Sequence, residues 1–332
     1  MKTKQLFFLF TFVLAMTACG DDDPVNIHGN SKSKSISDDN GPNTNRNTIG
    51  PTEAQPRYEF PQLKGGNNIT IVHKATLVNT SGDKGINYSV EWDPAINAQR
   101  WSCYQMYDVV SQSNVSRYSA TNDGTLSSNS QYPNDPDLPK AYQFTFDPYK
   151  YNNIDHGHIC PSADRLSSSE ANYQTFFITN MQPQYPNFNG SNRDPSINKR
   201  SPWYRLEDKL RTWAKSCDTL YVCKGGTIDK IGNDERIITY LTDQSLRENK
   251  IPVPKYFFVA LFAKKGTNYK AVGFWMEHVS SYDSQRPLSY YARTIDELEK
   301  LTDIDFFCNL PDNIEDVVEK SYSESDWAGN LQ

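Results

Sequence analysis

The chain has 332 residues, of which 37% are hydrophobic and 22% are charged. The hydrophobic share is below the roughly 45–50% usual for soluble domains, which indicates that part of the chain does not contribute to a core. With 34 basic and 40 acidic residues, the net charge is −6, and this balance excludes a protein that binds nucleic acid or acidic lipid through its overall field. Any polyanionic partner must therefore be held by a local basic patch.

The first nineteen residues have the pattern of an export signal. Lys2 and Lys4 precede an apolar stretch at residues 6–16, which is too short to span a bilayer because spanning needs about 20 residues. The stretch ends in Met-Thr-Ala-Cys, which resembles a bacterial lipobox and predicts lipidation of Cys19. An ordinary secretory signal with a chance cysteine is the alternative. We expect an exported protein that the lipid anchors to the outer membrane, periplasmic or at the cell surface, without other membrane contact.

Residues 20–57 are dominated by Asn, Ser, Asp, Gly, Pro and Thr. Such a segment buries too little apolar surface to offset the entropy of ordering, so we predict a disordered tether. From residue 58 onward there is neither a repeat nor a second linker. We therefore predict one domain at residues 58–325, followed by a short tail at residues 326–332.

The domain shows strand signals followed by scattered helix signals. Ser201 and Pro202 predict the start of a helix of about fourteen residues, in which Leu206, Leu210 and Trp213 share one face. This order favours an α+β fold with a central antiparallel sheet flanked by helices. Strands are expected at residues 86–92, 100–107, 176–178, 218–229, 256–263 and 269–277, a loop at 120–140, and further helices at 294–301 and 315–322.

Cysteine usage agrees with export. Once Cys19 is assigned to lipid, five cysteines remain, so at least one is unpaired even where disulfides can form. The spacing of Cys217 and Cys223 does not fit a structural zinc site. The pairing stays open among Cys103, Cys160, Cys217, Cys223 and Cys308, and for Cys160 a disulfide or a buried thiol is favoured over a nucleophile.

Two of the five histidines stand together in the sequence Asp-His-Gly-His at residues 155–158. A neutral imidazole can deprotonate a water molecule, although His156 and His158 could also be paired zinc ligands. Amide and carboxylate side chains follow, and their oxygens suit a hard cation such as Mg²⁺. Together they indicate metal-assisted hydrolysis of a phosphodiester. These further candidates are Asn180, Asn189 and Glu207.

Residues 155–165, DHGHICPSADR, resemble the D-R-G-H-x-x-P signature of the DNA/RNA non-specific endonucleases. Two more segments match in the same order: residues 176–184, FFITNMQPQ, and residues 203–207, WYRLE. Several linked motifs in the right order are more specific than any single motif. The resemblance covers about residues 58–325. It implies an antiparallel fold with a ββα-metal (His-Me finger) motif, and an endonuclease that hydrolyses phosphodiester bonds in DNA and RNA.

The resemblance also implies roles for single residues. His158 matches the general base that activates water, and Asn189 matches the ligand of a single Mg²⁺, for which Mn²⁺ could substitute. Glu207 matches a carboxylate that orients metal-bound waters, and Asn180 matches an asparagine that supports the geometry. The metal would stabilise the leaving 3′ oxygen, which implies products with 5′-phosphate and 3′-hydroxyl ends.

One position departs from the signature, because His156 stands where the family has arginine. Either a protonated His156 replaces the arginine beside the phosphate, or activity is reduced and shifts toward lower pH. Arg100 and Arg165 are candidates for a fixed positive charge, the alternative being ordinary surface arginines. We also expect His156, Arg165 and Arg205 to contact the substrate.

Residues 193–215 contain seven basic and three acidic residues, a local charge of +4 that includes Arg205. This segment is a candidate phosphate-binding groove, and a solvated helix face is the alternative. The competing function is a surface lipoprotein that binds nucleic acid or another polyanion on the same fold without cutting it. The oligomeric state and the preference for DNA or RNA stay open at this point.

Overall fold

The structure is a computed structural model in which the export signal, Cys19 and all but the last residue of the predicted tether lie outside the described part. No helix in the described part is long and apolar enough to cross a membrane. The residues described are 57–78, 82, 84–190, 200–241, 251–327, 329 and 331.

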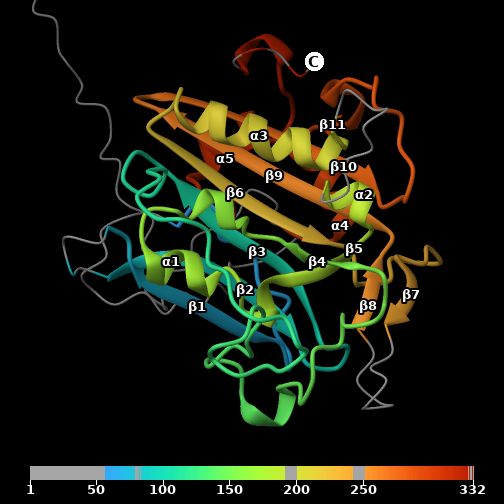
Figure 1. Ribbon diagram of the computed structural model, residues 1–332. Helices are drawn as coiled ribbons and strands as arrows, with labels where there is room; N and C mark the ends of the chain where they lie inside the picture. Colours follow the sequence, from blue (N-terminus) through green and yellow to red (C-terminus); the bar gives the residue numbers. More distant parts are fainter. Residues whose placement is uncertain are drawn as a thin grey trace, which may run out of the picture.

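A seven-stranded sheet forms the centre of the fold (Figure 1). Its strand order is β1-β2-β3-β6-β9-β10-β11, and every neighbouring pair is antiparallel. This arrangement confirms the expected α+β class with a central antiparallel sheet. The strands are β1 (Ile69–Thr76), β2 (Lys84–Asp93), β3 (Ala98–Met106), β6 (Thr219–Gly226), β9 (Tyr256–Lys265), β10 (Asn268–Glu277) and β11 (Ala292–Arg293).

The helices of the described part are short, apart from one that lies along the sheet. The α-helices are α1 (Ser169–Gln174), α2 (Pro186–Asn189), α3 (Pro202–Ala214), α4 (Ile295–Thr302) and α5 (Asp312–Val318). Single turns of 3₁₀-helix are η1 (Lys140–Tyr142), η2 (Ser162–Asp164), η3 (Ile178–Asn180), η4 (Leu288–Tyr291) and η5 (Glu324–Asp326).

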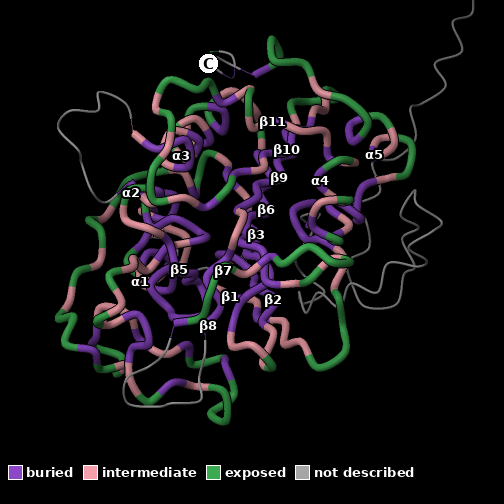
Figure 2. Tube along the Cα trace, turned by 90° about the vertical axis from the view of Figure 1, so that its right-hand side faces the viewer, coloured by how far each residue is buried: buried purple, intermediate pink, exposed green. Residues whose placement is uncertain are grey.

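The central sheet is covered on both faces, as β9 shows. Phe257 and Leu261 of this strand belong to the core that includes α3, whereas Phe258 and Phe262 belong to the core that includes α4. The two sets alternate because successive side chains of a strand point to opposite faces of the sheet. Figure 2 shows the sheet edge-on between α3 on one side and α4 and α5 on the other.

Helix α3 begins as its sequence predicts. The Ser201 side chain accepts a hydrogen bond from the Tyr204 backbone N–H at 3.1 Å, and Pro202 occupies the first turn, where no N–H is needed. The apolar stripe of α3, which includes Leu206 and Leu210, is buried against the sheet. The opposite face carries the charged residues of the helix.

A small second sheet stands beside the central one. Its strands β4 (Asp155–His158) and β5 (Met181–Gln184) pair antiparallel, so that His158 lies opposite Met181. The chain continues from β5 into α2, which gives the ββα order that the sequence predicts. A third, two-stranded sheet consists of β7 (Ile237–Leu241) and β8 (Ile251–Pro254).

The strand expected at residues 176–178 is wrong. Phe176 and Phe177 follow α1 in a turn, η3 begins at Ile178, and β5 begins only after η3. The Asn180 side chain stabilises this turn, because its Nδ2 atom donates to the Thr175 carbonyl at 2.8 Å. These residues are apolar because the turn is buried, and an apolar run alone does not distinguish a strand from a buried turn.

The helix predicted at residues 315–322 is α5, which begins after Pro311 and ends at Val318.

The five cysteines of the described part are free thiols. Cys103 and Cys223 are neighbours in the register of β3 and β6, and burial raises the pKa of Cys160 to about 12. Cys160 is thus a buried, protonated thiol.

Candidate active site

A cavity of about 590 Å³ lies where β4, α2 and α3 meet. Four of the residues singled out in the sequence line it, namely His156, His158, Asn189 and Glu207. They come from three elements, and the fold brings them to one place. Other side chains of the wall include Arg117, Tyr132, Tyr149, Lys150, Tyr204 and Arg211.

Gly157 separates the two histidines of β4 for a steric reason. A Cβ atom at this position would collide with the side chain of Gln184, which is fully buried on β5. The backbone of Gly157 is ordinary extended strand, so the glycine is needed for this close approach and not for an unusual backbone path. With Gly157 against β5, the strand alternation places His156 and His158 together on the side of the cavity.

His158 has the geometry of a general base. Its Nδ1 atom lies 3.2 Å from the backbone carbonyl of His156, and because a carbonyl only accepts, Nδ1 carries the proton. Its Nε2 atom has no hydrogen-bond partner among the described residues. Burial, together with the positive charge of Arg117, lowers the pKa of His158 well below 6.5. The ring is therefore neutral at pH 7, with an available lone pair on Nε2.

Asn180 supports the backbone that follows His158. Its Oδ1 atom accepts from the Cys160 N–H at 2.9 Å, and its Nδ2 atom donates to the Cys160 carbonyl at 2.9 Å. The side chain is fully buried and does not line the cavity. Asn180 thus positions the loop after β4 and does not touch a reacting group.

Asn189 is fixed at the end of α2. Its Nδ2 atom donates to Oδ2 of Asp155 at 2.8 Å, which identifies the nitrogen of the amide and leaves Oδ1 as an oxygen donor. Helix α2 stops here because Gly190 takes a left-handed conformation with φ of 80°. Asp155 and Asn189 thus bring a carboxylate and an amide to the same wall of the cavity.

Glu207 enters the cavity from α3 and is paired with a buried lysine. The Nζ atom of Lys224 lies 2.7 Å from Oε1 of Glu207, and it also lies 4.5 Å from the ring centre of Trp203. Burial raises the pKa of Glu207 above its ordinary value, although the charge of Lys224 opposes the shift. Lys224 therefore helps to keep this carboxylate ionised.

His156 is held on three sides. Its Nε2 atom lies 2.9 Å from both carboxylate oxygens of Asp147. Its ring stacks on Tyr132 with a centroid distance of 3.5 Å and on Tyr149 with one of 4.4 Å. Asp147 and the two tyrosines were not identified from the sequence. They fix the orientation of the residue that replaces the arginine of the family signature.

The structure does not bring the predicted arginines to this cavity. Arg100 is buried and pairs with Glu91 at 3.1 Å and Asp229 at 2.7 Å. Arg165 is also buried, and its guanidinium donates to backbone carbonyls, including that of Asn87 at 2.9 Å. Arg205 points away, donating to the carbonyl of Arg286 at 2.6 Å. None of these three arginines lines the cavity, which argues against the substrate contacts expected of them.

Two other arginines take their place in the cavity wall. Arg117 lies 4.7 Å from the ring centre of Phe176, and burial lowers its pKa. Arg211 pairs with Asp164 at 2.9 Å and lies one helical turn after Glu207. The i, i+4 spacing on a predicted helix could have identified Arg211. Arg117 lies in a loop without a pattern, so the sequence carried no signal for it.

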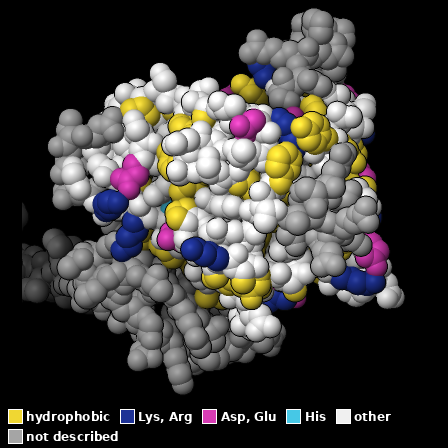
Figure 3. All heavy atoms as spheres, turned by 60° about the horizontal axis from the view of Figure 1, so that its bottom comes forward, with side chains coloured by type: hydrophobic (Ala, Val, Ile, Leu, Met, Phe, Trp, Pro, Cys, Tyr) yellow, Lys and Arg dark blue, Asp and Glu magenta, His cyan; other side chains and the backbone are white. Residues whose placement is uncertain are grey.

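The basic side chains of the described part of residues 193–215 lie in different places in the fold. Of its described residues, Arg211 lines the cavity, and Arg200 packs 4.3 Å from the ring centre of Tyr204, another wall residue. Lys209 instead points away, toward the carbonyl of Gly329. On the face seen in Figure 3, basic and acidic side chains are interspersed rather than gathered into one continuous basic surface. The segment thus contributes only part of its positive charge to the cavity wall.

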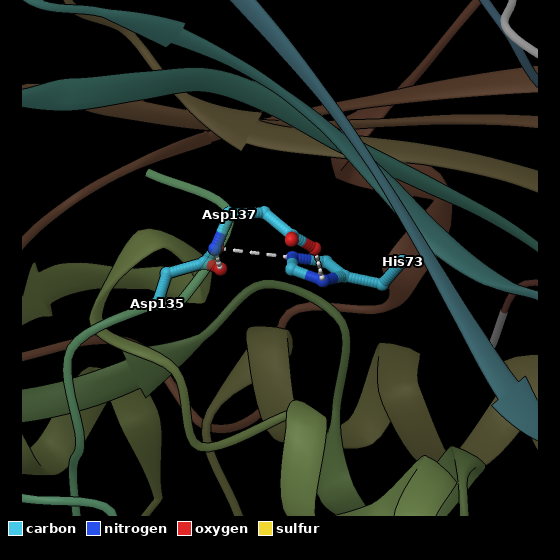
Figure 4. Close-up of side chains that lie close together, drawn as sticks. All are labelled: His73, Asp135 and Asp137. Atoms are coloured by element: carbon cyan, nitrogen blue, oxygen red, sulfur yellow. Dashed lines mark hydrogen bonds and ion pairs between the residues drawn. The ribbon is translucent and has the colours of Figure 1, made fainter. Parts of the chain in front are cut away.

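A second group of metal-ligand-type side chains lies outside this cavity. His73, Asp135 and Asp137 have donor atoms within 4.8 Å of one another, so they could hold a metal ion (Figure 4). However, Nε2 of His73 faces Asp135 at 3.1 Å and Nδ1 faces Asp137 at 3.5 Å. Burial would lower the pKa of His73, but the two carboxylates outweigh it and raise the pKa to about 9. The ring is then an imidazolium without a lone pair for a metal.

His156 and His158 do not form the alternative zinc site. Within the described residues, neither belongs to a group of three or more His, Cys, Asp or Glu side chains close enough to share an ion. The donors that converge on the cavity are mainly oxygens, which are typical ligands of Mg²⁺ and Mn²⁺.

Comparison with known proteins finds relatives that are nucleases. Nuclease C1 of Cunninghamella echinulata var. echinulata is 27% identical over 192 residues, which cover 57% of this chain and 71% of the relative. A nuclease of Nostoc sp. is 29% identical over 195 residues, covering 56% and 62%. Human mitochondrial nuclease EXOG is 23% identical over 239 residues, covering 70% and 59%. The alignments with the last two thus span less than two thirds of those proteins.

The fold comparison points the same way. A crystal structure of the EndoG/EndoGI complex matches with a TM-score of 0.50 and 17% identity, covering 71% of this chain and 87% of that chain. At this identity the match supports the fold alone. The family model described as DNA/RNA non-specific endonuclease matches residues 70–313, which is most of the chain. The chain therefore belongs to the DNA/RNA non-specific endonuclease family and is an enzyme of the nuclease class.

Proposed function

We propose that the protein is a metal-dependent, sugar-non-specific endonuclease that hydrolyses phosphodiester bonds in both DNA and RNA, with His158 as the general base. The observation that carries the proposal is the Nε2 atom of His158, which has no hydrogen-bond partner among the described residues and faces the cavity that Asn189 and Glu207 also line. A buried acceptor without a partner is costly unless a substrate or water uses it.

The environment of His158 fits proton abstraction from water. The low pKa keeps the ring neutral, so Nε2 can accept the proton as the water oxygen attacks phosphorus. The Nδ1–H group donates to the His156 carbonyl, which holds the ring in place and stabilises the imidazolium that forms. Phe176 packs edge-on against the ring at 4.8 Å and limits its rotation.

The oxygen donors of the cavity fit a hard divalent cation. Oδ1 of Asn189 would bind it directly, while Glu207, and with it Asp155, would bind water molecules of its hydration shell. When bound, Mg²⁺ or Mn²⁺ supplies positive charge for the leaving 3′ oxygen. The buried ion pair with Lys224 keeps the Glu207 carboxylate in a fixed orientation.

Positive side chains around the cavity would neutralise phosphate groups. Arg117 and Arg211 are held by packing and by an ion pair, so their guanidinium groups are already oriented. Lys150 and the ring of His156 add to the same wall. Because these groups contact phosphate and not base edges, binding would be independent of sequence and sensitive to salt.

The test is digestion of plasmid DNA and of RNA by the purified protein. We expect cutting of both with Mg²⁺, loss of activity in EDTA, and termini with 5′-phosphate and 3′-hydroxyl. His158→Ala should lose about 10²–10⁴-fold in rate while still binding nucleic acid in a gel-shift assay. Asn189→Ala should be inactive, whereas Asn187→Ala, an exposed change on the same helix, should cut normally.

The competing function is a surface lipoprotein that binds nucleic acid or another polyanion without cutting. It predicts a wild-type protein that shifts nucleic acid in the gel but leaves it intact at every Mg²⁺ or Mn²⁺ concentration. The free Nε2 atom of His158 favours the nuclease, because a binding protein does not need a neutral base in its cavity.

We further propose that the protein is exported and anchored through a lipid on Cys19. The proposal rests on the apolar stretch and the Met-Thr-Ala-Cys sequence that ends at residue 19. Growth with labelled palmitate should label the wild type and leave Cys19→Ala unlabelled. Cleavage without lipid would instead identify an ordinary secretory signal.

A further inference from the structure

Helices α4 and α5 cover the face of the sheet opposite α3, far from the catalytic cavity in the fold (Figure 2). Ile295 and Leu298 pack α4 onto the sheet. Its intervening acidic residues, Asp296 and Glu299, are half-buried and lie beside Glu319 at the end of α5. The backbone N–H of Asp296 donates to the carbonyl of Glu319 at 3.2 Å, so this junction joins the two helices.

Three carboxylates converge at the junction. One oxygen of each of Asp296, Glu299 and Glu319 lies within 4.8 Å of the others. Oxygens that coordinate one Ca²⁺ at 2.3–2.6 Å are at most about 5 Å apart, so this spacing fits a shared ion. Glu299 is oriented by the backbone N–H of Phe306, which donates to its Oε1 atom at 2.9 Å.

Glu319 shows that the junction is more than a solvated acidic surface. It is only 7% exposed, and its Oε1 atom has no hydrogen-bond partner within the described residues. A buried carboxylate without a partner is costly, and the cost is largest when other carboxylates are close. The nearby Glu315 is 1% exposed and adds to the negative charge.

The described basic residues offset this charge only from a distance, Lys300 toward Glu299 and Lys320 toward Asp296 and Glu319. No Lys or Arg of the described part lies within ion-pair distance of Asp296, Glu299 or Glu319. Lys300 is exposed, and Lys320 instead pairs with Asp316 at 2.8 Å. The junction therefore requires either protons or a bound cation.

We propose that Asp296, Glu299 and Glu319 bind one Ca²⁺ ion that joins α4 to α5. Oxygen donors alone favour a hard cation over Zn²⁺, and mixed mono- and bidentate carboxylates suit the flexible shell of Ca²⁺ better than the strict octahedron of Mg²⁺. The ion is structural, because it stabilises the helices that cover one face of the sheet. It is separate from the catalytic metal, which Asn189 binds on the other side.

The test is thermal unfolding of the full-length protein after EDTA treatment and transfer to metal-free buffer at pH 7.5. Ca²⁺ at 100 times its Kd should raise Tm by about 5 °C, and Mg²⁺ should raise it less. Titration calorimetry on Asn189→Ala, in which the catalytic metal site is disabled, should still find one Ca²⁺ per chain. These readouts do not depend on nuclease activity.

Two variants and a control locate the ion. Glu319→Gln should abolish the Tm shift and the calorimetric site, and Asp296→Asn should do the same if Glu319→Gln does not fold. Without Ca²⁺, Glu319→Gln should be at least as stable as the wild type, because it removes carboxylate repulsion. Asp316→Asn, which removes an α5 carboxylate paired with Lys320, should keep the full Ca²⁺ response.

Clear outcomes would overturn the proposal. The first is a wild-type Tm that does not respond to Ca²⁺ but falls as the pH is raised, which would show that protons neutralise the carboxylates. The second is a full Ca²⁺ response that persists in both Glu319→Gln and Asp296→Asn.

Discussion

The Nε2 atom of His156 lies 2.9 Å from each carboxylate oxygen of the buried Asp147. This contact, with the stacking of Tyr132 and Tyr149, sets the direction of the imidazole ring. Only Nδ1 is left to face a ligand. The position that carries arginine in the family signature thus holds a histidine whose charge, when present, is partly offset by a fixed carboxylate.

Replacing that carboxylate tests what His156 contributes. In Asp147→Asn the ring loses a charge-assisted hydrogen bond, and we expect kcat/KM for a defined oligonucleotide to fall about tenfold. His156→Arg should retain activity, because Asp147 can bind a guanidinium with both oxygens. Tyr149→Phe keeps the stacked ring and is the matched control. Wild-type activity in Asp147→Asn would show that His156 has no role in the reaction.

The pKa of His158 predicts the acid side of the pH profile. Because that pKa is lowered well below 6.5, the imidazole stays unprotonated at mildly acidic pH. If His158 is the base, as proposed, kcat/KM should decline only well below pH 6.5. The positive charge of Arg117 contributes to the shift, so Arg117→Gln should move the decline to higher pH. A decline at pH 6.5 or above in the wild type would contradict the burial of this base.

The Lys224–Glu207 pair predicts how activity depends on pH when the charge of Lys224 is removed. Burial already raises the pKa of Glu207, and Lys224 limits the rise. In Lys224→Met the carboxyl should protonate at higher pH, so activity at pH 7 should fall and should recover as pH rises. The variant should also need a higher Mg²⁺ concentration for half-maximal rate. Lys209→Met, a change on α3 at a side chain that points away from the cavity toward the Gly329 carbonyl, should alter neither quantity.

The cavity residues found from the sequence are those with a local pattern. His158 lies in the Asp-His-Gly-His motif, and Glu207 lies on a helix whose start Ser201 and Pro202 predict. Local patterns extend over one element and predict which residues share its face. They predicted α3 and five strands of the central sheet, β2, β3, β6, β9 and β10, for the same reason, whereas β1 and β11 were not predicted.

Residues that act through long-range contacts were not predictable in this way. Asp147 and Lys224 contact the cavity residues His156 and Glu207 from a loop and from β6, and no sequence period connects the partners. Arg100 was misplaced for a related reason. Its partner Asp229 is 129 residues away, so the buried ion pair that occupies its guanidinium leaves no trace in the sequence.

His73 offers a prediction about stability rather than activity. Its pKa is raised to about 9 in the fold, above the ordinary 6.5, because Asp135 and Asp137 outweigh burial. The added stability should be full below pH 6.5 and should be lost as pH rises through about 9. His73→Gln leaves the Asp135 carboxylate buried without its counter-charge, and the cost should be about 3–5 kcal/mol at pH 6. Urea unfolding at pH 6, 8 and 10 measures both effects.

The control for His73→Gln is Asp137→Asn, which changes the more exposed of the two carboxylates. Its loss of stability should be smaller, because the exposed Asp137 side chain is solvated in either form. A metal at this cluster would produce a different result. EDTA would then destabilise the wild type but not His73→Gln, and the stability of the wild type would rise with pH as the imidazole became free to coordinate.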